Sequence, residues 1–210
     1  MSVTFLTNKD KEEIDARISD LEYVPIEIVS FSNNITTKEI GSIIKSVDFS
    51  WRLNKEAKSI TIGSIVVAPT FNSYTLTGVT LTEDTKWTLK VTDERGLEDS
   101  KTTKLTFLNG VYYGVSDSID EINSKFILTL RKALAISRSK TISVTANEGQ
   151  YIYYCVPTRF GNCNFNVGGF DGGFELVTTL DFTNSYGYTE SYDVYKSTNP
   201  SLGSTTIVIS

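Results

Sequence analysis

The sequence predicts a mainly β protein, with a short N-terminal helix, an immunoglobulin-like β-sandwich, and a second antiparallel β domain that contains one helix. Stretches of alternating polarity recur roughly every ten residues, which is the pattern of short strands joined by turns. Apolar residues with helical spacing occur mainly in residues 7–22 and 118–135. The composition changes near Asn109 and Gly110, after which nine of the eleven tyrosines occur. We therefore expect three segments: residues 1–22, 23–108 and 109–210.

Length and charge restrict the function. The 210 residues are enough for two small domains, and their net charge is −5. The charge is −3 over residues 1–22, zero over 23–108 and −2 over 109–210, without a basic block. Because nucleic-acid binding requires a cationic surface, this distribution argues against it. No apolar run approaches the roughly 18 residues of a membrane span, and the first residues lack a signal-peptide pattern. We expect neither a membrane segment nor a cleaved signal.

The chain contains no histidine. This removes histidine-based triads, histidine metal ligands and the usual general base near neutral pH. The two cysteines, Cys155 and Cys163, cannot form a closed zinc site without further ligands. They are either reduced, which is the ordinary state, or joined in a disulfide. The prediction is a non-enzymatic protein with no cofactor and no metal.

Residues 7–22 predict the first helix. Thr7 is followed three positions later by Asp10, which is a variant of the capping-box pattern. The helix is therefore expected to begin near Asn8.

This helix carries a narrow apolar stripe. Ile14, Ile18 and Leu21 recur at positions i, i+4 and i+7 among charged residues. An isolated helix of about 15 residues is marginal in water, so the stripe either packs on its own domain or joins equivalent helices in a short coiled coil. The prediction for residues 1–22 is an anchor and oligomerisation segment of a homotrimer, with a dimer left open.

Six stretches between residues 23 and 108 have the pattern of strands: YVPIEIVSFS, SVDFSWRLN, SITIGSIVV, SYTLTGVTL, KWTLKVTD and TTKLTFL. Their alternate apolar positions should face one core, so Trp51 and Trp87 are predicted core residues and not ligand platforms. Asp93 and Gly96 supply the turn chemistry of a hairpin, whose charges are expected to be solvated.

The last hundred residues predict one helix and several strands. Ser118 and Glu121 form a capping-box pattern ahead of a helix over residues 118–135. Its apolar face would comprise Ile119, Ile122, Phe126, Leu130 and Leu134. Strands are predicted at KTISVTA, YIYYCVP, NFNVGGF, FELVTTLDFT, SYDVYKS and STTIVIS. In YIYYCVP, alternate residues should point to opposite faces of the sheet.

Tyrosines near the C-terminus are candidates for contact with a glycan or a partner: Tyr186, Tyr188, Tyr192 and Tyr195. An aromatic face with a polar tip suits sugar rings. The alternative is a structural role in the sheets or in subunit interfaces.

Two further groups of residues are candidate sites. Carboxylates could form a glycosidase pair if two lay about 5–10 Å apart, or they could simply be surface charges: Asp171, Glu175, Glu190 and Asp193. They do not have the spacing of a calcium loop. The segment VGGFDGGF lacks the lysine and hydroxyl residue of a phosphate loop, so its glycines are predicted to form tight turns.

Several strings together carry a resemblance: VTFLTNKDKEEI, SWRLNKEAKSITI, YTLTGVTLTEDTKWTLKVTDERG, TFLNGVYYGVS, EGQYIYYCVP, VGGFDGGFELV and GYTESYDVYKS. Over nearly its whole length, the chain resembles structural proteins of tailed bacteriophages, of the tail, baseplate or fibre type with an immunoglobulin-like domain. Such proteins occur in phages of Gram-positive and gut bacteria. TFLNGVYYGVS and GGFDGGF are the most specific strings, and they are structural rather than catalytic.

The resemblance implies a role for each segment. Residues 1–22 would dock to the particle or assemble the oligomer, residues 23–108 would act as a spacer, and residues 109–210 would face outward. It implies a virion protein that is assembled in the host bacterial cytoplasm and takes part in host attachment. The implied partners are further copies of itself, other virion proteins and a host-surface glycan. The chain lacks the long β-helical or hydrolase domains of fibres that cut host polymers, which is compatible with an accessory or decoration fibre that does not contact the host.

Three other interpretations stay open. The chain could be a decoration fibre of the capsid head. It could be a bacterial surface adhesin or carbohydrate-binding module, although a signal peptide and a cell-wall anchor are missing. It could also be a small hydrolase with paired carboxylates. The sequence leaves its position on the virion and its receptor open.

Overall fold

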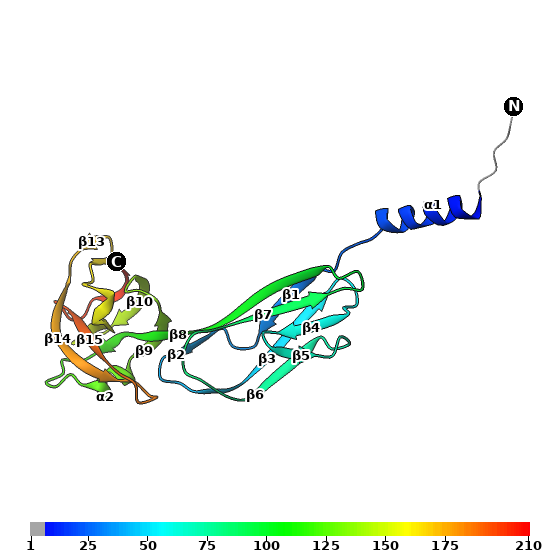
Figure 1. Ribbon diagram of the computed structural model, residues 1–210. Coiled ribbons are helices and arrows are strands. Elements are labelled where there is room, and N and C mark those ends of the chain that lie inside the picture. The colour runs from blue at the N-terminus through cyan, green and yellow to red at the C-terminus, as the bar shows by residue number, and fades with distance from the viewer. Residues whose placement is uncertain (1–6) are drawn as a thin grey trace. The chain divides into compact units, whose positions relative to one another are not determined.

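The structure is a computed structural model that describes residues 7–210, and it is mainly β, with an N-terminal helix and one further α-helix (Figure 1). This confirms the predicted fold class. The first six residues of the expected N-terminal segment lie outside the described part. Packing divides the chain into two compact units. The first holds the described residues up to Asn34, with Val47–Leu76 and Lys86–Lys104; the second holds Ile35–Ser46, Thr77–Thr85 and Leu105–Ser210.

The N-terminal helix α1 spans Asn8–Leu21 and begins where the capping pattern predicts. The Thr7 hydroxyl accepts the N–H of Asp10 at 3.2 Å, and the Asp10 carboxylate accepts the N–H of Thr7 at 2.8 Å. This reciprocal pair satisfies donors that a helix start leaves free. No residue of α1 is buried.

The first unit is an immunoglobulin-like sandwich of two sheets. One sheet has the order β1-β3-β6, and the other continues from β8 through β7 and β4 to β5. These strands are β1 (Ile28–Asn33), β3 (Ile44–Leu53), β4 (Ser59–Ile62), β5 (Ile65–Val67), β6 (Ser73–Leu81), β7 (Thr85–Thr92) and β8 (Glu98–Ser116). The sheets pack face to face, because the Phe49 ring of β3 meets the Trp87 ring of β7 edge-on, with 5.1 Å between centroids. Trp51 and Trp87 are both buried, as predicted.

Two local features of the first hundred residues differ from the prediction. The stretch SITIGSIVV is a hairpin and not a single strand: β4 and β5 pair in antiparallel fashion with Ile62 opposite Ile65. Gly63 turns the chain with a φ of +59°, a conformation that glycine adopts without steric cost. The short strand β2 (Thr37–Glu39), which was not predicted, pairs in parallel with β8.

The second unit contains two sheet layers, of which the first belongs, through β8, to the same nine-stranded sheet as β7, β4 and β5. One has the order β14-β15-β11-β8, with β9 also paired to β8, and the other has the order β10-β16-β12-β13. The strands are β9 (Arg131–Ala135), β10 (Lys140–Ala146), β11 (Tyr151–Pro157), β12 (Phe165–Val167), β13 (Phe170–Asp171), β14 (Phe174–Thr183), β15 (Thr189–Ser197) and β16 (Gly203–Ile209). Most of them fall on the predicted stretches, whereas NFNVGGF divides into the hairpin β12–β13.

Both faces of β11 are buried, and its residues alternate as predicted. Ile152 and Tyr154 pack in a cluster with Ile142 of β10 and Ile207 of β16. Residues of the opposite parity pack in a second cluster, which contains Tyr153 and the helix α2 (Ser124–Thr129). The sheet that contains β11 is therefore covered on one face by the second sheet and on the other by α2.

The predicted helix over 118–135 is wrong in extent. The helix α2 has only six residues, and Asn123 caps it by accepting the N–H of Phe126 at 3.2 Å. The last residues of the stretch form β9, which pairs with β8 from Tyr113 opposite Arg131 to Asn109 opposite Ala135. Completing the sheet beside β8 overrides the helical pattern, since local propensity is a weak determinant compared with tertiary pairing.

The strands β3, β6 and β8 each contribute residues to both units. Strand β8 runs without interruption through Asn109 and Gly110, where the change in composition suggested a boundary. The packing division falls at Leu105 instead. The assignment of an anchor, a spacer and a display segment remains a prediction.

Candidate interaction site

The predicted assembly residues lie exposed on α1. The exposed fractions are 41% for Ile14, 45% for Ile18 and 87% for Leu21. Of the two arrangements that the sequence left open, packing of the stripe on its own domain is not observed. Large aliphatic side chains with helical spacing on an otherwise charged helix are suited to contact with another molecule.

The hairpin between β7 and β8 contacts the C-terminal end of α1 through Arg95. Asp93 turns the chain as predicted: its carboxylate accepts the backbone N–H groups of Arg95 at 2.9 Å and Leu97 at 3.0 Å. Gly96 has a φ of +81° and donates to the Asp93 carbonyl. The expectation that this tip is solvated is wrong for Asp93, which is 1% exposed.

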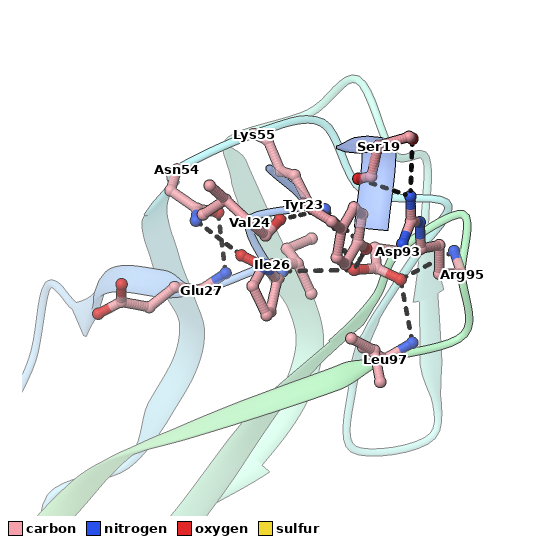
Figure 2. Close-up of polar contacts among 11 residues, drawn as sticks. Ser19, Tyr23, Val24, Ile26, Glu27, Asn54, Lys55, Asp93, Arg95 and Leu97 are labelled. Carbon is pink, nitrogen blue, oxygen red and sulfur yellow. Dashed lines mark hydrogen bonds and ion pairs between the residues drawn. The ribbon is translucent and has the colours of Figure 1, made fainter. Parts of the chain in front are cut away.

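Asp93 is buried because it also binds the segment that follows α1 (Figure 2). The Tyr23 hydroxyl donates to its Oδ2 atom, and the Ile26 N–H donates to the same atom at 3.3 Å. The Lys55 ammonium lies 3.2 Å from this oxygen and donates to the Tyr23 hydroxyl at 2.8 Å. A buried carboxylate is stable only when such donors replace water. The base of α1 is therefore fixed to the first unit by a polar cluster.

The electrostatics of this cluster favour its charged form. Burial alone would raise the pKa of Asp93, but hydrogen bonds from Tyr23 and from backbone N–H groups outweigh it and hold the pKa well below 3.8. Desolvation would lower the pKa of Lys55, but the contacts with Tyr23 and Asp93 prevail and raise it. Both groups are therefore charged over the physiological pH range.

Arg95 connects the cluster to α1 itself. Its guanidinium lies 3.8 Å from the centre of the Tyr23 ring, whose centre is also 4.0 Å from the Lys55 ammonium. It forms an ion pair with Asp20 at 2.7 Å and donates to the Ser19 carbonyl at 3.3 Å. Asp20 is largely exposed, so this pair contributes little by itself. A groove of about 640 Å³ lies beside these residues and is also lined by Ile18 and Val24.

The four candidate tyrosines separate into two pairs. Tyr192 and Tyr195 are buried, and their hydroxyls bond to the Gly110 carbonyl at 2.7 Å and the Cys163 N–H at 3.2 Å. Neither ring can receive a sugar, because both are core residues. Tyr186 and Tyr188 lie in the turn between β14 and β15 and remain accessible. Only these two keep the candidate role.

The four candidate carboxylates lie on three strands, β13, β14 and β15. Glu190 and Asp193 lie on β15 at positions of opposite parity, so their side chains point to opposite faces of the sheet. Glu190 pairs with Arg159 at 2.5 Å, and Asp193 is buried and accepts the Thr179 hydroxyl at 2.7 Å. Asp171 accepts the Asn166 side chain at 2.7 Å. The fourth candidate, Glu175, is an exposed residue of β14.

An ion pair between a buried carboxylate and an exposed lysine in the second unit had no signal in the sequence. Glu39 of β2 is 4% exposed and binds the Lys132 ammonium at 2.6 Å and the Tyr112 hydroxyl at 2.9 Å. Burial, followed by the contact with Glu39, raises the pKa of Tyr112 far above its usual range. The three residues come from β2, β8 and β9, so only the fold brings them together.

Both cysteines are free thiols. Cys155 is buried, and burial raises its pKa well above its usual range. Burial likewise raises the pKa of the half-buried Cys163 to about 11. The reduced state, which was the ordinary expectation, is the one observed.

Turn formation explains the glycines of VGGFDGGF. Gly168 and Gly169 connect β12 to β13 with φ values of +58° and +96°. Gly172 and Gly173 lead from β13 to β14 with φ values of +102° and +80°. These are backbone conformations that favour glycine.

Residues 7–210 hold no candidate for a membrane-spanning helix or a metal cluster. No helix in this range is long and apolar enough to cross a membrane. No group of three or more potential metal ligands occurs within the same range.

Comparisons with known proteins do not identify a family. No protein-family model matches the chain, and no curated protein matches it. Similar solved structures include the N-terminal eight immunoglobulin domains of Down syndrome cell adhesion molecule, at 8% identity and a TM-score of 0.28. Another is a chitinase from Bacillus thuringiensis, at 12% identity and a TM-score of 0.25. The matches cover 84% and 87% of this chain but only 23% and 26% of those chains. Scores this low carry no argument about function.

Proposed function

We propose that this chain is a non-enzymatic structural protein of a bacteriophage virion, a fibre or a tail or baseplate accessory component that self-associates through α1. The observation that carries the proposal is the exposed stripe of Ile14, Ile18 and Leu21 on a helix that buries none of its residues in its own chain. Burial of apolar surface contributes roughly 25 cal/mol per Å². Association of several copies of α1 would supply that burial and stabilise a helix that is marginal alone.

The base of the helix supports an assembly role. Asp93 and Arg95 fix the chain where α1 leaves the sandwich. These contacts leave the apolar stripe exposed, since they involve Ser19, Asp20 and Tyr23. A helix that is held at its base and exposed along its stripe suits the joining of identical chains.

The virion setting rests on the resemblance to tail, baseplate and fibre proteins, and the partners follow from it. The other partners would be further virion proteins, with assembly in the host bacterial cytoplasm. The second unit would be the displayed portion, and Tyr186 and Tyr188 are the accessible aromatic residues there. Several copies on one particle would gain avidity even from weak single contacts.

The test is the location of the protein. Cells that make phage particles and the full chain are lysed, the particles are banded by density, and the band and washed cell envelopes are analysed by mass spectrometry. We expect the chain in the particle band and expect the variant Ile14→Ser/Ile18→Ser/Leu21→Ser to be lost from it. The control Glu13→Ser/Ala16→Ser changes the other face of α1 and should stay in the band. Recovery only from envelopes would contradict the proposal and favour a surface adhesin.

A further inference from the structure

A surface cleft in the second unit has no role in the assembly proposed above. Two adjoining hollows, of about 300 and 430 Å³, share Arg131, Val144 and Thr145 in their walls. Their volumes fall within the usual size range of small-molecule sites. The walls come from β8, from the end of α2 through the start of β9, and from β10 with β16.

Arg131 is the one charged residue in these walls. The second unit has two other arginines: Arg138 donates to the Phe160 carbonyl at 2.9 Å, and Arg159 pairs with Glu190. Within the described residues, the guanidinium of Arg131 has no hydrogen bond and no ion pair. Its backbone is fixed at the start of β9, opposite Tyr113 of β8. The Arg131 side chain is exposed, its donors are free and the same walls hold no carboxylate, so it can receive a ligand carboxylate.

The rest of the wall is rich in hydroxyl groups. Ser143 and Thr145 on β10 pair with Thr206 and Ser204 on β16, with side-chain oxygens 3.2 and 2.9 Å apart. Each hydroxyl of such a pair still has capacity to bond a ligand, since it offers one donor and two acceptor sites. Strand β10 is also the edge of its sheet, so backbone groups at its unpaired side add donors and acceptors. The lining therefore fits a ligand with several hydroxyl groups.

The smaller hollow, of about 300 Å³, also has apolar lining residues. Val115, Leu130 and Val144 line it, and Gly114 contributes no side chain. A Cβ at position 114 would lie 3.3 Å from the Leu130 side chain, so glycine keeps this hollow open. Sugar rings present apolar C–H faces as well as hydroxyls, and these aliphatic groups can pack against them.

We propose that this cleft binds an acidic saccharide, with Arg131 receiving the sugar carboxylate and the hydroxyls of β10 and β16 receiving the ring hydroxyls. A peptide strand added at the β10 edge is the competing occupant. It would need a row of side-chain pockets along the edge, whereas the lining is mostly short hydroxyl side chains. No residue of α1 lines the cleft. Saccharide binding and assembly through α1 can therefore each fail without the other.

The experiment is a titration of the ¹⁵N-labelled full chain, followed by the amide shifts of Gly114, Thr145 and Ser204. The probes are glucuronate, glucose, acetate and an acetylated glutamate peptide, all at one ionic strength. We expect saturable shifts with glucuronate, and affinity at least about tenfold weaker for the three other probes, because each lacks the carboxylate or the ring hydroxyls.

Two variants locate the binding. Arg131→Gln should weaken glucuronate binding at least about tenfold. Lys125→Gln, which removes an exposed positive charge of the same unit outside the cleft, should leave binding unchanged. The proposal is overturned if glucuronate gives no saturable shift, if acetate or the peptide binds as tightly as glucuronate, or if both variants weaken binding equally.

Discussion

At the scale of single residues, Asp93 holds the base of α1. The turn TDERG predicted that this residue would shape a hairpin, and it does. Its burial had no local signal, because Tyr23 is 70 positions away in the chain. A local sequence pattern cannot indicate a contact between residues this far apart in the chain.

The lowered pKa of Asp93 makes part of the stability pH-dependent. Below about pH 4 the unfolded chain binds a proton at this carboxyl while the folded chain does not, so the free energy of unfolding falls as the pH falls. Asp93→Asn removes this contribution. We expect the variant to be less stable than the wild type at pH 7, with the difference narrowing toward pH 3, in urea unfolding followed by fluorescence. A difference that stays constant from pH 7 to pH 3 would contradict the proposed role of the ionised carboxylate.

Gly41 is a second residue whose role becomes clear only in the fold. It has a φ of +90°, and a Cβ there would lie 2.6 Å from the Tyr188 Cβ. The turn that carries Tyr188 is held by Asn184, whose side chain donates to the Ile40 carbonyl at 2.8 Å. The close approach and the backbone conformation both require glycine.

Substitution of Gly41 tests this close approach. We expect Gly41→Ala to lower the free energy of unfolding by at least about 2 kcal/mol, from strain and displacement of the turn. Gly149 has a similar φ of +79° but open space around it, so Gly149→Ala is the matched control and should cost only about 1 kcal/mol. Equal losses in chemical denaturation would mean that the contact with Tyr188 contributes nothing.

At the scale of elements, strands and the first helix were predictable where the local pattern and the tertiary environment agree. The alternation in YIYYCVP and the capping pair of Thr7 and Asp10 both appear in the structure. The stretch 131–135 has helical spacing but forms β9, because β8 offers it a pairing edge. The order of the strands and the cleft beside Arg131 could not be predicted, since each depends on pairings between distant residues.

The N-cap of α1 provides a test of whether the helix drives association. Thr7→Ala removes the hydroxyl that accepts the Asp10 N–H and should cost the helix about 1 kcal/mol. We expect weaker self-association and lower helicity at the same protein concentration, measured by sedimentation and circular dichroism. Thr7→Ser retains the hydroxyl and should behave as the wild type. Unchanged self-association of Thr7→Ala would mean that assembly does not depend on the stability of α1, which would contradict this prediction.

At the scale of the whole molecule, the chain combines two β units with a helix, α1, none of whose residues is buried. The sequence predicted this class of fold and the stripe on α1. It did not predict that the second unit would include residues 35–46 and 77–85, since those segments join it through pairings such as that of β2 with β8. The exposed stripe on α1 is the feature that suits the chain to self-association.

Light scattering of the full chain measures whether α1 joins copies of this protein. It compares the wild type with Ile14→Ser/Ile18→Ser/Leu21→Ser and with the control Glu13→Ser/Ala16→Ser. All five positions are exposed, so the β units should keep their thermal unfolding in every variant. We expect the mass of a trimer for the wild type and the control, and the mass of a monomer for the stripe variant. A monomeric wild type, or a stripe variant that keeps the wild-type mass, would contradict assembly through α1.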